Sequence, residues 1–417
     1  MFFILILLFI PIYLFLYYFF FIEKPILIIS KENEEKLASL DLKKNNLKIE
    51  KSNFVLWALA NKKLKLLFQN YKPNLFFING HVQTIVGSEL RTKPLIYFKR
   101  FFYEMSDGER TVVDQAVWKG IQLDETTPII VLLHGLSGSS DSNYIRHAIV
   151  SFTRNFTKQF RILIMHARGA AKALERVTDD QENVDKEDFL LRKPMFYCAA
   201  FTNDVHETGK LLQEEFPKAP KIVIGYSLGA NVTTHYLAEV ESPSPFIGGA
   251  GVCNPYDLNI VNQERMKSYP GKLYSSVLVK GLKGFLQRNY KVFRENSDFD
   301  IDAALAVNTV HEFDKTVVVP IHKYNNVEHY YQQGSSARQA HAIRVPFLSI
   351  AAADDPLIPL SVRPVERCAS QTMYVSTERG GHVAHLMNGS LTGASWFDNV
   401  LCEYVDALLE FNSLQQK

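Results

Sequence analysis

Several features are missing from this 417-residue sequence, and each absence excludes a class of protein. The four cysteines stand far apart, at Cys198, Cys253, Cys368 and Cys402, and no Cys-x-x-Cys pair indicates a zinc or redox site. There is no excess of one charge, because 46 Lys and Arg against 44 Asp and Glu leave a net charge of +2. This balance gives no electrostatic argument for nucleic acid as a partner. With 47% hydrophobic and 22% charged residues, global disorder is excluded.

Charged side chains are also missing from the first 22 residues, MFFILILLFIPIYLFLYYFFFI. A helix that spans the hydrocarbon core needs about 20 apolar residues, so this run is long enough. A cleaved signal peptide is the alternative, but no basic segment precedes the run and no small-x-small cleavage site follows it. We therefore expect residues 1–22 to be an uncleaved transmembrane anchor of a single-pass protein of the endoplasmic reticulum or another endomembrane. The lysines that follow favour a cytosolic catalytic part.

The remainder of the chain predicts an α/β fold. Continuous apolar runs at 128–134, 160–166, 221–224, 246–253 and 345–351 alternate with helical stretches at 144–153, 200–216 and 230–240. Such runs are typical of a mostly parallel central sheet that is buried on both faces by flanking helices. We divide the chain into a linker and N-terminal region (23–94), a first core part (95–256), an insertion (257–342) and a second core part (343–412). The insertion has no strong strand and many charged and aromatic residues, which favours a helical lid.

A candidate nucleophile stands at the end of the third apolar run. The string Gly225-Tyr226-Ser227-Leu228-Gly229 follows a strand and precedes a helix, which is the context of a nucleophile elbow. In so tight a turn the flanking side chains would collide with neighbouring backbone, hence Gly225 and Gly229. The backbone amide of Leu228 would open the helix and serve as an oxyanion donor. An idle serine in a glycine-rich turn is the alternative.

A second oxyanion donor is expected from the loop after an earlier strand. His134-Gly135-Leu136 follows the first apolar run directly, and Gly135 allows the turn that lets the amide of Leu136 face Ser227. His134, at the strand end, is expected to shape this loop by hydrogen bonding and not to act as the base.

The acid and the base follow the last two strands. Asp354 and Asp355 are both candidates for the acid; the proline four residues after Asp355 selects Asp355, with Asp354 as the alternative. His382, after Gly380 and Gly381, is the expected base, and His385 is expected in a helix. The order Ser227, Asp355, His382 is that of an α/β-hydrolase. No metal site is expected, because the pair His382 and His385 lacks a third ligand nearby, and no cofactor is indicated.

Eight strings together resemble the membrane-anchored abhydrolase domain-containing proteins 1 and 3 and their bacterial, plant and yeast relatives. They are Asn79–Thr84 (NGHVQT), His134–Ser140 (HGLSGSS), Ala167–Gly169, Gly225–Asn231, Asn254–Asp257, Glu312–Asp314, the Tyr330-Tyr331 pair with Ser335-Ser336, and Asp354–Pro356. The resemblance implies an α/β-hydrolase fold, one N-terminal anchor, the Ser227-Asp355-His382 triad, and work on acyl esters of lipids, including phospholipids with medium-length chains. One departure stands beside the expected site: the family's Asn-x-Arg-Gly reads His166-Ala-Arg-Gly here.

Three functions follow from these patterns. The first is a serine esterase or phospholipase with a lipid or ester substrate; the second is an acyltransferase that passes the acyl group to an alcohol, as yeast relatives do; the third is a binding protein without catalysis. Three further polar residues, His81, Asp204 and Asp257, are expected to be structural: His81 as a buried, hydrogen-bonded histidine, and the two aspartates in helix caps or loops.

Overall fold

The structure is a computed structural model that describes residues 21–39, 53–154, 159–174, 190–296 and 299–416. The expected membrane anchor, residues 1–22, therefore lies outside the described residues except for its last two. Among the described helices, none is long and apolar enough to cross a membrane.

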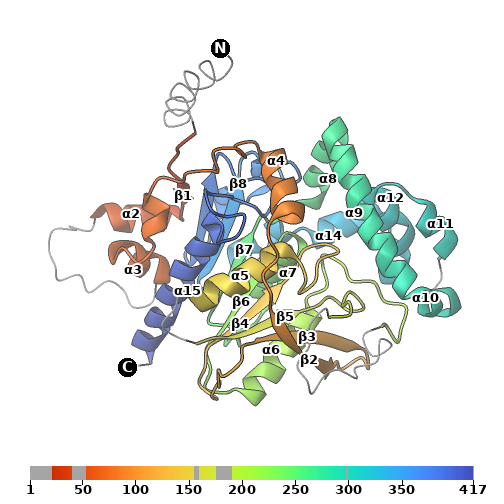
Figure 1. The fold of residues 1–417 in the computed structure, drawn as a ribbon, viewed down its shortest axis with the longest axis horizontal. Helices are drawn as coiled ribbons and strands as arrows, with labels where there is room; N and C mark the ends of the chain where they lie inside the picture. The colour runs from red at the N-terminus through yellow and green to blue at the C-terminus, as the bar shows by residue number, and fades with distance from the viewer. Residues whose placement is uncertain (1–20, 40–52, 155–158, 175–189, 297–298, 417) are drawn as a thin grey trace, which may run out of the picture.

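A nine-stranded sheet forms the centre of the molecule, in the order β1-β9-β8-β7-β6-β4-β5-β3-β2 (Figure 1). Strands β4 to β9 run parallel to one another, whereas β1 pairs antiparallel with β9 at one edge, and β3 pairs antiparallel with β5 and β2 at the other. The predicted mostly parallel sheet is thus confirmed, and the three edge strands are additions to it. The strands are β1 (Ile26–Ile28), β2 (Tyr97–Glu104), β3 (Arg110–Val117), β4 (Ile129–Leu133), β5 (Arg161–Met165), β6 (Lys221–Tyr226), β7 (Gly248–Val252), β8 (Phe347–Ala352) and β9 (Thr372–Thr377).

Helices cover both faces of this sheet, and the alternation of side chains along each strand decides which helix each residue meets. In β4, Ile130 and Leu132 join the core shared with α3 (Phe54–Ala60), α5 (Asn143–Arg154) and α15 (Trp396–Gln415). Their neighbours Val131 and Leu133 face the other way, towards α6 (Asn203–Glu215) and α7 (Leu228–Glu239). Burial on both faces explains why these strands are apolar without interruption.

Residues 257–342 fold into a cluster of helices whose core is separate from those of the sheet and also includes Ala170, Leu191 and Phe196–Ala199. In Figure 1 these helices lie on the right, on the opposite side of the molecule from α2 (Lys31–Ser39) and α3. No strand occurs in the part of this interval that the structure describes, as the sequence predicts. The helices are α8 (Leu258–Lys267), α9 (Tyr269–Arg288), α10 (Tyr290–Asn296), α11 (Ile301–Ala306), α12 (Val310–Phe313), α13 (Val319–His322) and α14 (Val327–Gly334), with the π-helical turn η5 (Asp314–Val318) and the 3-10 turns η6 (Ser336–Arg338) and η7 (Ala340–Ala342).

One short helix before the sheet lies beside the site. Helix α4 (Gly80–Ile85) is capped by Asn79, whose side chain accepts hydrogen bonds from the amides of His81 and Val82, and continues into the π-helical turn η2 (Val86–Leu90). The remaining elements are the 3-10 turns η1 (Lys65–Phe68), η8 (Leu360–Val362) and η9 (Val365–Arg367).

Candidate active site

Ser227 occupies a sharp turn between β6 and α7. Its backbone dihedrals, φ 53° and ψ −119°, lie in a region that residues with a side chain rarely adopt. A Cβ on Gly225 would lie 2.2 Å from the carbonyl oxygen of Gly229, and a Cβ on Gly229 would lie 2.4 Å from that of Leu133. The two glycines are therefore required by close backbone contacts, and the strained turn exposes the serine hydroxyl at the end of the strand.

Three side chains from separate loops form one hydrogen-bonded chain. His382 Nε2 lies 2.9 Å from Ser227 Oγ, and His382 Nδ1 lies 2.8 Å from Asp355 Oδ2. Because a carboxylate only accepts, the Nδ1 hydrogen points to Asp355 and Nε2 is left to accept from the serine hydroxyl. The side chains of His382 and Asp355 are only 12% and 2% exposed. The arrangement allows the imidazole to remove the serine proton and the carboxylate to stabilise the resulting positive charge.

The two neighbouring aspartates have different partners. Asp355 Oδ1 accepts from the amides of Leu357 and Ile358 while its Oδ2 faces the imidazole. Asp354 Oδ1 instead accepts from the amide of Gly381 at 2.9 Å, and burial raises the pKa of this carboxyl. The structure thus brings Asp355, and not Asp354, to His382.

The backbone of the His382 loop is held by α4. The amide of His382 donates to Thr84 Oγ1 at 2.8 Å, and the amide of Leu386 donates to Gln83 Oε1 at 2.7 Å. Thr84 in turn donates to the carbonyl of Gly80 at 2.7 Å. Sequence reasoning gave these residues no role, although they belong to the NGHVQT string on which the resemblance rests.

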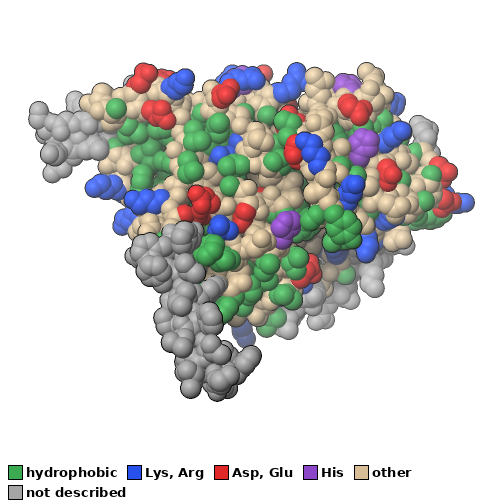
Figure 2. Space-filling view, turned by 90° about the horizontal axis from the view of Figure 1, so that it is seen from above, with side chains coloured by type: hydrophobic (Ala, Val, Ile, Leu, Met, Phe, Trp, Pro, Cys, Tyr) green, Lys and Arg blue, Asp and Glu red, His purple; other side chains and the backbone are tan. Residues whose placement is uncertain are grey.

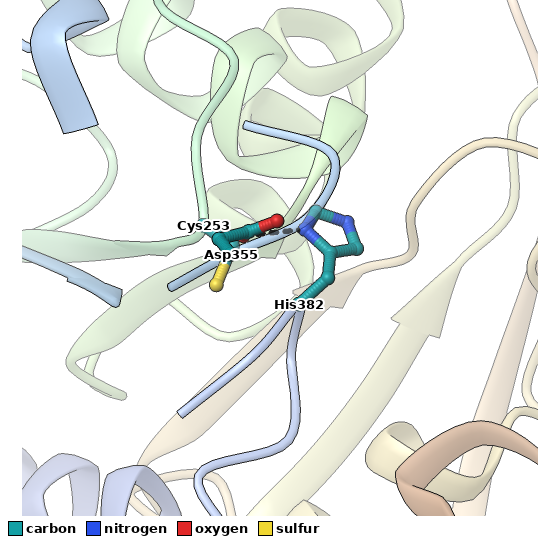
Figure 3. A group of neighbouring side chains, drawn as sticks. All are labelled: Cys253, Asp355 and His382. Atoms are coloured by element: carbon teal, nitrogen blue, oxygen red, sulfur yellow. Dashed lines mark hydrogen bonds and ion pairs between the residues drawn. The ribbon is translucent and has the colours of Figure 1, made fainter. Parts of the chain in front are cut away.

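Cys253 lies beside Asp355, on the side away from the imidazole of His382 in the view of Figure 3. Its Sγ accepts from the amide of Val383 at 3.3 Å, and the ligating atoms of Cys253, Asp355 and His382 all lie within 4.8 Å of one another. A metal ion bound here would compete with the hydrogen bond between Asp355 and His382. Burial and the charge of Asp355 raise the pKa of the Cys253 thiol well above its usual range, so this sulfur is a protonated thiol and a poor metal ligand.

The two expected oxyanion donors line the same pocket as Ser227 and His382. Leu228 is the first residue of α7, where backbone amides have no partner within the helix. Leu136 lies in the loop after β4, which ends at Leu133. The amide of its neighbour Gly135 is already bonded to the hydroxyl of Tyr144 at 2.8 Å. The amides of Leu136 and Leu228 are therefore the backbone donors to consider for an oxyanion at Ser227.

His134 shapes the oxyanion loop, as predicted. Its Nδ1 lies 2.8 Å from the carbonyl oxygen of Gly135, and its Nε2 accepts from the amide of Ala167. Burial lowers the pKa of His134 to about 3, so the ring is neutral at physiological pH.

Beside His134, the unusual His166 belongs to a buried polar network. Its Nε2 lies 2.8 Å from Asp114 Oδ2, and Asp114 also accepts from Arg100 and from Ser140 of the oxyanion loop. Although burial raises the pKa of Asp114, the contacts with His166 and Arg100 outweigh this and hold it well below its usual range. His166, which departs from the family pattern, thus helps to hold the oxyanion loop through its contact with Asp114, the acceptor of Ser140.

Two predictions about histidines are wrong. His81 is exposed, not buried, because this part of α4 lies at the surface. The expected hydrogen bond is present, with Nδ1 3.1 Å from the Tyr274 hydroxyl oxygen, and the ring stacks on Tyr274 of α9. His385 lies in a loop, not in a helix, since a φ of 44° breaks the helical path; it stacks on Trp396.

The two aspartates expected to be structural have structural contacts. Asp257 caps α8 by accepting from the amide of Ile260, and Asp204 forms a buried ion pair with Arg168.

A pocket of about 210 Å³ extends from Ser227 between the sheet and the helices of residues 257–342. Its walls are mainly apolar, and three polar residues from this helical segment stand out: Arg265, Asp314 and Tyr331. The Tyr331 hydroxyl donates to Asp314 Oδ2 at 2.8 Å, and burial raises the pKa of Asp314 to about 7. An apolar pocket with few polar groups suits a substrate that has a hydrocarbon chain.

Comparison with protein families identifies the group. Residues 128–388, more than half of the chain, match the model of the alpha/beta hydrolase fold. The chain belongs to the alpha/beta hydrolase family. The matched segment contains Ser227, Asp355 and His382, together with both expected oxyanion donors.

Curated relatives within this family are named as ester hydrolases. A monoacylglycerol lipase of Saccharomyces cerevisiae is 27% identical, covering 79% of this chain and 78% of its own. The phospholipase ABHD3 of Mus musculus is 23% identical, covering 82% of this chain and 79% of its own. The putative esterase YheT of Escherichia coli is 27% identical, covering 82% of this chain and 94% of its own. This alpha/beta hydrolase is thus an ABHD-like carboxylic ester hydrolase.

Proposed function

We propose that this hydrolase is a membrane-anchored serine enzyme that cleaves acyl esters of lipids through Ser227, His382 and Asp355. The observation that carries the proposal is the hydrogen-bonded chain from Ser227 Oγ through the imidazole to Asp355. The relatives named as a monoacylglycerol lipase and a phospholipase support a lipid ester as the substrate. The uncharged residues 1–22 support the anchor.

In the first half of the reaction, Ser227 Oγ attacks the ester carbonyl carbon while His382 Nε2 takes the hydroxyl proton. The carbonyl oxygen becomes an oxyanion that the amides of Leu136 and Leu228 stabilise by hydrogen bonds. The tetrahedral intermediate collapses when the bond to the alcohol oxygen breaks, and His382 returns the proton to that oxygen. An alcohol leaves, and the acyl group remains on Ser227.

In the second half, water takes the place of the alcohol. His382 removes a proton from the water as it attacks the acyl-enzyme, the bond to Ser227 Oγ breaks, and the proton passes to the serine. A carboxylic acid is released. Throughout, Asp355 keeps the imidazole in the tautomer that accepts at Nε2.

The helical segment 257–342 is proposed as the lid over this reaction. It supplies Leu258, Val261, Leu278 and Leu282 to the wall of the pocket. These side chains bound the space for an acyl chain, so the lid would select chain length, and we propose a preference for medium-length chains.

Fluorophosphonate labelling of the full chain tests the nucleophile. We expect wild type to be labelled and Ser227→Ala not, with Ser139→Ala, a serine of the oxyanion loop outside the triad, as the control that keeps its label. Equal labelling of wild type and Ser227→Ala would refute the proposal. Hydrolysis of a panel of phospholipids and neutral esters of increasing chain length, with and without ethanol, then measures chain preference and shows whether water or an alcohol accepts the acyl group.

A further inference from the structure

Apolar side chains are exposed on both sides of the pocket mouth. On one side are Val82, Ile85 and Leu90 of α4 and η2, exposed by 40%, 51% and 67%. On the other side are Tyr269, Leu273 and Val277 of α9, exposed by 82%, 57% and 56%. We call these six residues the apolar rim. Figure 2 looks onto this edge of the molecule and shows apolar side chains open at the surface among lysines and arginines.

The two halves of the apolar rim are held together above the pocket. The rings of His81 on α4 and Tyr274 on α9 stack with their centroids 5.7 Å apart, and His81 Nδ1 lies 3.1 Å from the Tyr274 hydroxyl oxygen. The same two segments line the pocket with Thr84 and Gly87 on one side and Leu278 on the other. The apolar rim therefore surrounds the entrance to the pocket that holds Ser227.

Helix α9 has apolar side chains on two opposite faces. Val279, Leu282 and Phe285 are buried in the helical cluster, whereas Leu273 and Val277, four residues apart, share an exposed stripe. Apolar side chains that gather at the surface of a protein commonly mark a contact with another protein, a ligand or a membrane. The exposed stripe is thus a surface that favours contact with something apolar.

The charges on α9 indicate the kind of partner. Its sequence, YPGKLYSSVLVKGLKGFLQR, has no acidic residue, and Lys272 and Lys280 are exposed beside the apolar stripe. An apolar stripe flanked by lysines is typical of helices that lie in the interface of a membrane with anionic lipids.

The chain also enters its folded part at this edge. Phe21, the first described residue, lies under the guanidinium of Arg379 at 4.7 Å, and Arg379 Nη1 donates to the carbonyl of Ile78, next to the Asn79 cap of α4. Phe21, which follows the uncharged segment in the sequence, therefore lies near the apolar rim, and a membrane that held this segment would lie close to the pocket mouth.

We infer that the apolar rim is a docking surface for a phospholipid bilayer, with Lys272 and Lys280 directed to its anionic head groups. The docked enzyme receives its substrate from the bilayer through the pocket mouth without passage through water. The purpose of this docking rests on the proposed lipid ester hydrolysis, but the contact itself does not depend on the chemistry at Ser227.

The kinetic test uses the full chain in vesicles of phosphatidylcholine and phosphatidylserine. We expect the double variant Leu273→Asp, Val277→Asp to lower hydrolysis of a vesicle-borne ester by about tenfold or more, because charge is driven into the interface. Hydrolysis of a short, water-soluble ester should change by less than about twofold, since neither residue lines the pocket. The matched control is Ile121→Asp, an exposed apolar residue after β3 that should leave both rates unchanged. Wild-type activity of the double variant on the vesicle ester, or an equal loss on both esters, would overturn the inference.

A depth measurement tests the contact independently of catalysis. A nitroxide at Leu273→Cys, in a Cys368→Ser background because Cys368 is the one native cysteine of the four that is not buried, reports access to lipid-soluble oxygen and to a water-soluble nickel chelate. We expect the nitroxide at residue 273 to be more accessible to oxygen, and a nitroxide at Ile121→Cys to be more accessible to the nickel chelate. The same pattern is expected when Ser227→Ala is added. Equal nickel access at both positions overturns the inference, and so does protection of residue 273 from both reagents, which indicates a protein partner. If wild type cleaves no soluble ester while residue 273 is in lipid, the proposed function fails and the docking stands.

Discussion

The hydroxyl of Thr84 joins two parts of the chain that are 298 residues apart, because it accepts from the backbone amide of His382 at 2.8 Å. The contact is one of several between α4 and the loops of the acid and the base. A Cβ on Gly80 would lie 1.9 Å from the carbonyl oxygen of Asp354, and a Cβ on Gly381 would lie 2.5 Å from that of Gly80. Helix α4, from the region expected to be a linker, therefore positions both loops of the candidate site.

Replacing Thr84 with valine tests this positioning role. The change keeps the shape of the side chain but leaves the His382 amide without its acceptor, which costs about 1–3 kcal/mol, so we expect kcat on a soluble ester to fall by about fivefold to a hundredfold. KM should change little, because the acyl pocket keeps its walls. Thr84→Ser restores the acceptor and should recover most of the rate. A kcat for Thr84→Val within about twofold of wild type would show that the contact does not matter for the reaction.

The two neighbouring aspartates give a second prediction. Asp355→Asn cannot stabilise a charged imidazole and favours the wrong tautomer, so kcat should fall by about 10⁴-fold. Asp354→Asn keeps an oxygen that accepts from the Gly381 amide, so we expect a loss of less than about tenfold. Steady-state kinetics on one soluble ester, with circular dichroism as the control for folding, compares the two variants. The reverse order of losses would make Asp354 the acid.

The central sheet could be predicted from sequence because strands that are buried on both faces are apolar without interruption. The runs at 128–134 and 221–224 coincide with β4 and β6 to within two residues at each end. The edge strands gave no such signal. In β2 the sequence YFKRFFYE carries charged side chains that face solvent or form buried ion pairs. Strand β1 is three residues long, and its one partner among the described strands is β9, far along the chain.

The site shows the same division between local and long-range information. Ser227 and its glycines follow from the local requirements of a sharp turn, and Asp355 and His382 from their place after strands. The positions of His81 and His385 could not be predicted, since the first depends on a contact with Tyr274 far along the chain and the second on how the loop after β9 packs against Trp396 at the start of α15. The same is true of the contact that puts Asp314 against Tyr331 in the pocket.

A glycine of the elbow gives a third prediction. In Gly225→Ala the new methyl carbon would lie only 2.2 Å from the carbonyl oxygen of Gly229, so we expect little folded protein. The control is Gly284→Ala in α9, where a Cβ meets nothing closer than 3.8 Å. There alanine should leave stability unchanged or raise it by up to about 1 kcal/mol, because glycine costs conformational entropy in a helix. Thermal unfolding separates the cases, and a Gly225→Ala protein as stable as wild type would contradict the steric argument.

The buried carboxyl of Asp314 gives the last prediction, which concerns stability against pH. Burial raises its pKa from 3.8 to about 7 in the folded protein, so the folded state keeps a proton that the unfolded state releases between about pH 4 and 7. Stability must therefore fall as the pH rises through this range, by about 4 kcal/mol at most from this group, and stay level above it. Asp314→Asn cannot ionise and still accepts from the Tyr331 hydroxyl, so it should lack this decline. We expect the melting temperature of the variant, relative to wild type, to rise from about pH 5 to about pH 8. Asp406→Asn on the exposed side of α15 is the control for the chemical change. If the melting temperatures of wild type and Asp314→Asn differ by the same amount at every pH in this range, Asp314 is ionised in the folded protein, with Arg265 of the same pocket as its counter-charge.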